Sequence, residues 1–312
     1  MTPIGLGFAG VGWLGESLIR ELSAVAGLEL VGVQDTQLER AQAVSARHGH
    51  PWAGQRFDDL LQLPGVDAVV ICTPNALHVP QATQALQAGK HVLVQKPLAL
   101  SFADAQATVE LARSTGRMLF VDYTYRFLAT VTALQQALVK SGRVRAIRAE
   151  FHNIYGPGVE KTWFFDPQLS GGGALIDLGV HLLDLALWLV EPRAVRLEHA
   201  EIERGGIEHT AALRLHLGDD IPFELAVSWN APLAHTRIAF ELECDRGRLS
   251  WQNVDGSFYR FRTLRDRHVL MERETTLRSD TLRAFASALR TGAWPAVDTR
   301  VYALLEQAYH GG

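Results

Sequence analysis

Hydrophobic residues follow two different patterns along this chain, and the change falls near residue 125. In the first part, short apolar runs alternate with segments whose apolar residues recur every three or four positions. The apolar runs predict buried strands and the segments between them predict helices. Because strands that alternate with helices form parallel sheets, the first part predicts a doubly wound α/β domain of the Rossmann type.

The predicted strands of this first part end at positions where polar residues or glycines follow. The strands cover residues 4–9, 28–34, 68–72, 91–94 and 118–123. The helices cover a run after Gly15 through Leu22, 39–47, 77–88 and 101–115, the last opened by a capping pair at Ser101 and Asp104. Ligands bind beyond the carboxyl ends of such strands. Gly10, Asp35, Thr73 and Lys96 all follow strand ends, so we expect them to line one ligand edge.

The second part is dominated by period-two alternation. Apolar and polar residues alternate over residues 213–217, 221–229 and 238–244, and a further strand is predicted at 144–154. This pattern predicts antiparallel strands with one buried face. Helices are predicted at 127–139, up to residue 190, at 280–290 and at 300–309, with a long aromatic loop at 155–170. We therefore predict an α+β domain with an open sheet over residues 124–312, after a first domain over residues 1–123.

A glycine-led stretch, Gly171 to Asp184, carries three ionisable residues on a leucine-rich helical pattern. Asp177, His181 and Asp184 are spaced by four and three residues, which places them on one helical face. The glycines before the helix are expected to leave its first amides open to a ligand. By itself the pattern fits equally a buried charge network and the wall of an active site.

The segment Gly10-Val11-Gly12-Trp13-Leu14-Gly15 lies between the first strand and the first helix, and Asp35 follows the second strand. A glycine turn in this context lets a pyrophosphate approach the helix N-terminus, while the later carboxylate accepts from a ribose hydroxyl. The alternative is an α/β turn with packing glycines. Asp35 favours NAD over NADP, and Arg40 weakens that preference.

Lys96 follows an apolar strand at the predicted ligand edge and precedes Pro97. A loop lysine is most often a solvated surface charge. At this position it is instead placed to exchange a proton with a substrate hydroxyl beside a nicotinamide.

Composition narrows the class of protein. The 312 residues carry a net charge of −4, with 30 Lys and Arg spread along the chain, which argues against a nucleic acid or an anionic membrane as partner. The two cysteines lie in apolar runs, as expected of reduced thiols in the cytoplasm. We predict no signal peptide, no membrane span and no metal site.

Four motifs together resemble the Gfo/Idh/MocA family of sugar and polyol oxidoreductases: GFAGVGWLG, Lys96-Pro97, Tyr125-Arg126-Phe127 and GGGALIDLGVHLLD. The resemblance covers essentially the whole chain. It implies a catalytic trio of Lys96, Asp177 and His181. It also implies a dinucleotide site, with NAD favoured over NADP, that is lined by Gly10, Gly12, Trp13, Leu14, Asp35, Thr73, Pro74, Asn75, His78, Gln95 and Lys96.

The resemblance implies reversible hydride transfer between a carbinol carbon and C4 of the nicotinamide. His181 takes the hydroxyl proton, Asp177 orients the imidazole, and Lys96 polarises the same oxygen; either His181 or Lys96 serves as the base. Asp184 is expected to be structural, bonded to backbone or to an arginine. Tyr125, His152, Asn153 and Trp163 are candidates for a polar sugar site, each as readily structural.

One departure and two alternatives accompany this resemblance. The family usually has Glu before Lys-Pro, whereas this chain has Gln95, which still bonds a ribose hydroxyl but removes a negative charge beside Lys96. The first alternative is a non-catalytic dinucleotide-bound sensor, and the second is a reductase of a non-sugar carbonyl or a cyclic diol. Relatives commonly pair through the open sheet, so we expect a homo-oligomer, a dimer or a tetramer.

Overall fold

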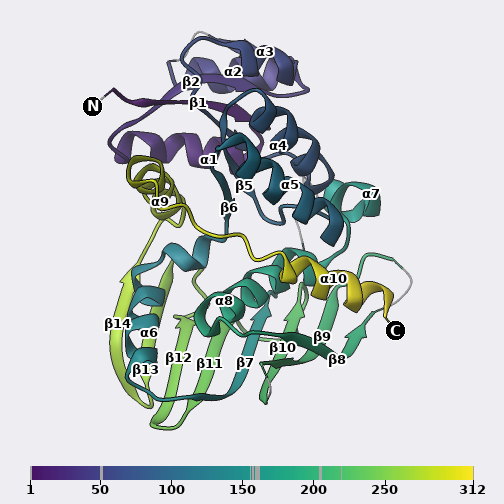
Figure 1. The fold of residues 1–312 in the computed structure, drawn as a ribbon, viewed down its shortest axis with the longest axis vertical. Helices are drawn as coiled ribbons and strands as arrows, with labels where there is room; N and C mark the ends of the chain where they lie inside the picture. Colours follow the sequence, from purple (N-terminus) through teal and green to yellow (C-terminus); the bar gives the residue numbers. More distant parts are fainter. Residues whose placement is uncertain are drawn as a thin grey trace. The chain divides into compact units, whose positions relative to one another are not determined.

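The computed structural model describes residues 2–49, 52–154, 156, 158, 162–203, 206–218 and 220–311. The chain forms two compact units. The first unit comprises Met1–Asp122 and Arg278–Val297, and the second comprises Tyr123–Leu277 and Asp298–Gly312. Figure 1 shows the helices and strands of both units.

The first unit is built on a six-stranded parallel sheet with the strand order β3-β2-β1-β4-β5-β6. The strands are β1 (Ile4–Ala9), β2 (Leu28–Gln34), β3 (Ala53–Gly54), β4 (Ala68–Ile71), β5 (His91–Gln95) and β6 (Leu119–Asp122). The order reverses between β1 and β4, the point at which doubly wound sheets bind their ligands. The predicted Rossmann architecture is confirmed.

Helices cover both faces of this sheet, with α1 beside α9 and α4 beside α5 (Figure 1). The helices of the unit are α1 (Trp13–Glu21), α2 (Leu38–Arg47), α3 (Phe57–Gln62), α4 (His78–Gln87), α5 (Phe102–Thr115) and α9 (Arg278–Thr291), with short 3-10 turns η1 (Leu22–Ala24) and η2 (Asn75–Leu77). The predicted cap of α5 is present, because the Ser101 hydroxyl accepts from the backbone N–H of Asp104 at 3.1 Å.

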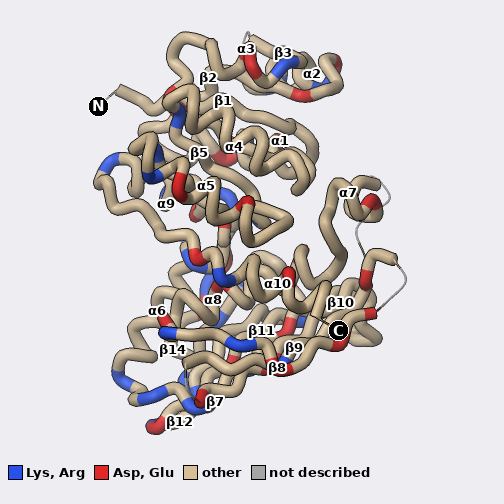
Figure 2. Tube along the Cα trace, turned by 45° about the vertical axis from the view of Figure 1, so that its right-hand side comes forward, with Lys and Arg blue, Asp and Glu red and all other residues tan. Residues whose placement is uncertain are grey.

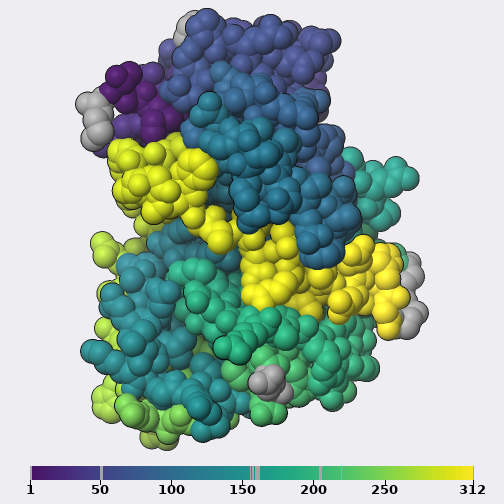
Figure 3. Space-filling view, in the orientation of Figure 1, coloured from purple at the N-terminus to yellow at the C-terminus, as the bar shows by residue number. Residues whose placement is uncertain are grey.

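Residues 278–297 belong with the first unit rather than with the second, where the sequence pattern placed them. The fully buried ring of Phe285 on α9 meets Phe120 of β6 edge to face, with centroids 5.4 Å apart. In Figure 3 the yellow surface of α9 lies against the purple N-terminal segment. Burial of this apolar helix face decides where α9 packs, and that choice is not visible in the local sequence.

The second unit contains an eight-stranded sheet with the order β14-β13-β12-β11-β7-β10-β9-β8, in which only β7 and β10 pair in parallel. Its strands are β7 (Val144–His152), β8 (Val195–Ile202), β9 (Thr210–Leu217), β10 (Ile221–Ser228), β11 (Arg237–Cys244), β12 (Gly247–Asn253), β13 (Arg260–Arg265) and β14 (His268–Glu274). The predicted open, mostly antiparallel sheet is confirmed.

One face of this sheet is covered by helices α6, α8 and α10 (Figure 1). The helical segments are α6 (Ala129–Val139), α7 (Pro167–Ser170), α8 (Val180–Val190) and α10 (Arg300–His310), with 3-10 turns η3 (Thr124–Phe127) and η4 (Thr162–Phe165) and a π turn η5 (Leu175–Gly179). The opposite face carries charged side chains of both signs, among them Arg148, Glu224, Arg237 and Glu241. Figure 2 marks the chain positions of the basic and acidic residues.

The helical stretch Pro167–Val190 is long and apolar enough to cross a membrane by length and composition alone. However, 78% of its most apolar window is buried inside the protein. It is therefore the central core helix of the second unit, packed against the sheet.

Candidate functional site

The glycine turn of the first unit is shaped by close backbone packing. Gly10 has a φ of +79°, and a Cβ there would lie 2.9 Å from the carbonyl group of Cys72. A Cβ on Gly15 would lie 2.2 Å from the carbonyl oxygen of Gly10. A Cβ on Gly12, by contrast, would meet no described atom within 4 Å. The N-terminus of α1 thus faces open space, as the binding of a pyrophosphate requires.

Asp35 follows β2 and is 4% exposed. Its carboxylate accepts from the backbone N–H groups of Val11 at 3.1 Å and Gln37 at 3.0 Å. Arg40 also contacts it at 3.2 Å, and the Arg40 side chain is 42% exposed. A ribose hydroxyl at this point would therefore meet a carboxylate, and a 2′-phosphate would meet the guanidinium beside it.

His78 is almost fully buried and connects two loops of the ligand edge. Its Nδ1 lies 2.6 Å from the carbonyl oxygen of Pro97, and its Nε2 lies 2.8 Å from that of Thr73. Burial lowers the pKa of His78, and the charge of Lys96 lowers it further, although the two carbonyls favour the protonated ring. The ring connects the loops that carry Thr73 and Lys96, and its contribution to a dinucleotide site stays a prediction.

Gln95, which the resemblance places beside the dinucleotide, contacts a carboxylate of its own unit. Its side chain is buried, and its amide nitrogen donates to the carboxylate of Asp122 at 2.7 Å. The other oxygen of Asp122 accepts from the Thr281 hydroxyl at 2.7 Å. A carboxylate therefore stands beside Gln95 on the neighbouring strand β6.

The N-terminus of the glycine-led helix in the second unit is closed, contrary to the prediction of open amides. The buried carboxylate of Glu208 accepts from the backbone N–H groups of Gly173 at 2.8 Å and Leu175 at 3.0 Å. The Tyr309 hydroxyl donates to the same carboxylate at 2.7 Å. A Cβ on Gly173 would lie 2.0 Å from the Glu208 carbonyl oxygen, so this glycine admits Glu208 rather than a ligand.

The three ionisable residues of this helix differ in their exposure. From Gly172 to Leu187 every residue is buried except Asp177 and His181. Asp177 lies within the π turn η5, where the sequence spacing predicted a regular α-helix. Such turns occur frequently at functional sites. The two accessible groups are thus the pair that the resemblance assigns to catalysis, and Asp184 is fully buried.

Trp229 holds the carboxylate of Asp177. The indole N–H donates to Oδ2 of Asp177 at 3.0 Å, and the indole is 1% exposed. The alternation of apolar and polar residues predicts that Trp229 is buried. It does not indicate where the indole N–H points. A buried N–H that donates to a carboxylate fixes the orientation of that carboxylate.

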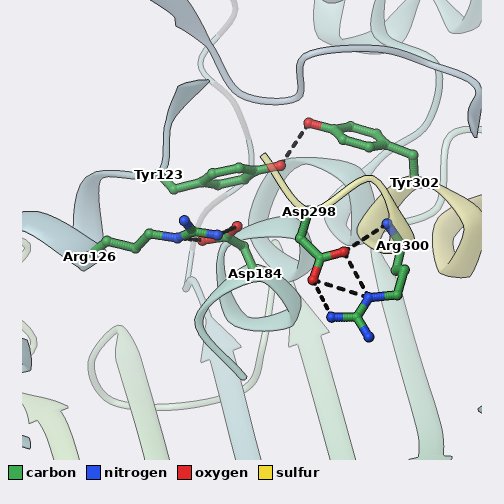
Figure 4. Close-up of polar contacts among 6 residues, drawn as sticks. All are labelled: Tyr123, Arg126, Asp184, Asp298, Arg300 and Tyr302. Atoms are coloured by element: carbon green, nitrogen blue, oxygen red, sulfur yellow. Dashed lines mark hydrogen bonds and ion pairs between the residues drawn. The ribbon is translucent and has the colours of Figure 1, made fainter. Parts of the chain in front are cut away.

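Asp184 forms a buried ion pair with Arg126, which confirms that it is bonded to an arginine (Figure 4). The Arg126 Nε donates to Asp184 at 2.6 Å, and a second guanidinium nitrogen donates to the other carboxylate oxygen. Burial raises the pKa of Asp184 to about 7, and Arg126 opposes that rise. The Arg126 guanidinium also stacks on Tyr123, whose hydroxyl bonds that of Tyr302 at 2.7 Å. This network anchors α8 one turn beyond His181.

Three of the four substrate candidates, Tyr125, His152 and Trp163, lie in different surroundings. The Tyr125 ring is 6% exposed and packs on His181, with centroids 5.0 Å apart. Trp163 stacks on Phe164 at 4.1 Å. His152 lies 3.3 Å from Glu150, and strand alternation places both on the face of β7 opposite to Phe151, which contacts Tyr125. The structure therefore groups Tyr125 with His181 and separates His152 from it.

The members of the predicted catalytic trio are divided between the two units. Lys96 follows β5 at the ligand edge of the first unit, while Asp177 and His181 belong to the second unit. Within the described residues, no group of three or more His, Cys, Asp or Glu side chains is arranged to hold a metal ion.

Family models match both units. A model described as an oxidoreductase family with an NAD-binding Rossmann fold matches residues 4–123, and the GFO/IDH/MocA C-terminal domain matches residues 136–250. The chain is 30% identical over 244 residues to a 1,5-anhydro-D-fructose reductase of Ensifer adhaerens, covering 77% of this chain and 72% of that protein.

A second relative and two solved structures extend the comparison. The chain is 33% identical over 180 residues to the D-glucoside 3-dehydrogenase of Escherichia coli (strain K12), spanning 55% of this chain and 50% of that one. GenD2 from gentamicin A biosynthesis, solved with NAD, has a TM-score of 0.85 at 23% identity, covering 100% and 96% of the two chains. KijD10, a 3-ketoreductase from Actinomadura kijaniata solved with NADP, has a TM-score of 0.84 at 21% identity, covering 99% and 98%. At these identities the solved structures establish the fold.

Proposed function

The chain belongs to the Gfo/Idh/MocA family of NAD(P)-dependent oxidoreductases, and we propose that it moves a hydride between the nicotinamide and a sugar, polyol or related carbinol. The observation that carries this proposal is the exposure pattern of the glycine-led helix. Asp177 and His181 alone are accessible between Gly172 and Leu187, and Trp229 fixes Asp177. An acid and an imidazole that are accessible within an otherwise buried helical segment are suited to proton transfer.

In the oxidative direction, the C–H bond of the carbinol gives up a hydride while the hydroxyl proton passes to a base of the protein. When bound, the nicotinamide supplies the hydride acceptor at its C4. His181 takes the proton, and the Asp177 carboxylate orients the imidazole and stabilises its charged form. Lys96 hydrogen-bonds the same oxygen and stabilises the negative charge that develops on it; in the second version of this mechanism Lys96 is the base.

The residues of the first unit fit a nicotinamide dinucleotide. The α1 N-terminus and its glycine turn would hold the pyrophosphate, and Asp35 would accept from the adenine ribose. The Asp35 carboxylate favours NAD, while Arg40 at 3.2 Å lets the site also accept NADP. We therefore propose NAD as the preferred cofactor and NADP as a tolerated one.

The proposed substrates are cyclic or open-chain sugars and polyols. The names of the relatives support this class, since one reduces 1,5-anhydro-D-fructose and another oxidises D-glucosides at C3. We also propose that copies of the chain pair through the open face of the second unit's sheet. A groove of about 500 Å³ on that face is lined by both acids and bases, including Arg148, Glu224, Arg237 and Glu241, a charge pattern that can match a second copy of itself.

A screen with the purified chain tests the catalytic proposal. Aldoses, ketoses, polyols, inositols and glycosides are offered with NAD and NADP in the oxidative direction, and the corresponding ketosugars with NADH and NADPH. Absorbance of the reduced cofactor at 340 nm reports turnover. We expect turnover with at least one sugar or polyol. Tight dinucleotide binding without turnover on any substrate would favour the non-catalytic sensor, and turnover confined to non-sugar carbonyls would favour the second alternative.

A further inference from the structure

Helix α9 delivers an arginine to the start of helix α1, although the two helices lie at opposite ends of the sequence. Arg278, the first residue of α9, donates from Nε to the Ser17 hydroxyl at 3.2 Å. Its Cζ lies 5.3 Å from the centroid of the Trp13 indole. Trp13 and Ser17 are one turn apart on α1, so the guanidinium lies along the first turns of that helix.

The charge of Arg278 also acts on Cys72, the residue that follows β4. Burial raises the pKa of the Cys72 thiol, Asp122 raises it further, and Arg278 lowers it. β1 and β4 are neighbours at the point where the strand order of the sheet reverses. Helix α1 begins directly after β1, so Arg278, which contacts Trp13 and Ser17, lies beside a helix that starts at the switch point of the sheet.

We propose that Arg278 binds the pyrophosphate of the dinucleotide. This inference rests on the dinucleotide binding of the proposed function and adds a residue to it. Backbone N–H groups at the α1 N-terminus and the positive end of its dipole attract an anion, and a guanidinium supplies the charge-assisted, forked hydrogen bonds that suit phosphate oxygens. Ser17 engages only Nε, whereas the two terminal nitrogens of the guanidinium carry four further N–H donors.

Trp13 pre-organises this arginine. The indole is 56% exposed, unusual for so large an apolar side chain, and the guanidinium packs on its face. Cation–π contact together with the Ser17 hydrogen bond holds the guanidinium near one position before a ligand arrives. A pre-positioned cation loses less side-chain entropy on binding, and more of its interaction energy is then expressed as affinity.

Binding of ADP-ribose isolates the pyrophosphate contact, because this ligand keeps both phosphates and lacks the nicotinamide. Dissociation constants for ADP-ribose and NADH are measured by calorimetry for the full-length wild-type chain and for R278A, R278M and R278K. R283A is the matched control, because Arg283 lies on the same helix and pairs with Asp280 at 3.2 Å on the surface. The melting temperature of each ligand-free variant is recorded in parallel.

We expect R278A and R278M to weaken both ligands by about tenfold or more, R278K to weaken them less, and R283A to bind like the wild type. The loss should shrink as salt concentration rises. R278M retains the aliphatic stem of the side chain. If R278A melts at a lower temperature than the wild type, the affinities of R278M are compared with the wild type instead. A folded R278M that binds ADP-ribose within twofold of the wild type overturns the proposal, and so does a loss confined to NADH. If the wild-type chain binds neither ligand, the proposed function itself fails.

Discussion

The two units position their candidate functional residues in opposite ways. In the first unit the ligand edge is made of strand ends, backbone turns and loop carbonyls, with His78 connecting the loops after β4 and β5. In the second unit the accessible pair Asp177 and His181 depends on side chains from distant segments. Trp229 of the strand region holds Asp177, and Arg126 anchors the helix through Asp184.

The buried carboxylates of the two units show what this difference means energetically. Asp122 in the first unit accepts from the neutral donors Gln95 and Thr281. Asp184 in the second unit faces the cation Arg126 (Figure 4). Breaking a buried charge pair leaves one uncompensated charge, whereas losing one neutral donor costs a single hydrogen bond. We therefore expect the second unit to be the more sensitive to single substitutions.

Replacing the proposed proton-transfer groups should have the largest effect. K96A, from the first unit, and H181A, from the second, should each lower kcat by about 100- to 10,000-fold, the usual contribution of a general acid or base. Binding of NADH, followed by fluorescence titration, should stay within about threefold of the wild type. In the oxidative direction, kcat should fall at low pH because the base becomes protonated. The residue whose replacement abolishes this fall is the base. Undiminished turnover in either variant would remove that residue from the mechanism.

Cutting the ion pair of the second unit should give the largest effect on stability. D184N should lower the free energy of unfolding by about 3–5 kcal/mol, because the Arg126 charge is left buried and cannot be neutralised. R126M should cost less, about 1–3 kcal/mol, because the Asp184 carboxyl, whose pKa is already about 7, can take up a proton.

Denaturant unfolding checks this order, with R148A as the control. Arg148 pairs with Glu224 on the exposed sheet face at 3.0 Å, and its loss should change stability by less than about 1 kcal/mol. Equal losses of unfolding free energy for D184N and R126M would contradict the prediction that proton uptake by Asp184 reduces the cost of losing Arg126.

Removing the indole donor of Trp229 tests whether the second unit positions its acid through a side chain. W229F keeps a buried aromatic ring but deletes the N–H bonded to Asp177. We expect kcat to fall by about 10- to 100-fold, as for loss of a hydrogen bond to a charged group, with NADH affinity unchanged. W251F is the control, since that buried indole donates at 3.0 Å to the Thr130 hydroxyl. A W229F enzyme with wild-type kcat would make Trp229 a packing residue only.

The smallest expected effect concerns the exposed Arg40 of the first unit. R40A should weaken NADP binding by about fivefold through loss of a solvent-screened contact with the 2′-phosphate, and NAD binding should change by less than twofold. Titrations with both cofactors measure the ratio. An equal loss for NAD and NADP would instead mean that Arg40 acts by orienting Asp35, with which it is in contact at 3.2 Å.

The sequence alone determined five of the six strands and the ligand edge of the first unit, but it did not predict β3 or α3. Strand ends and helix starts follow from local periodicity, and parallel strands of known order bring Gly10, Asp35, Thr73 and Lys96 to one edge. The predicted strand 4–9 and the cap at Ser101 agree with the structure because each depends on neighbouring residues only.

The tertiary structure decided which distant side chains complete each part of the site. Glu208 closes the glycine-led helix, Gln95 turns its amide to Asp122, and Arg278 reaches the start of α1. These pairings depend on which surfaces pack together once the chain has folded, and the net free energy of each contact is too small to leave a periodic signal in the sequence. Local patterns specify the elements, and packing between segments far apart in the chain specifies the polar partners.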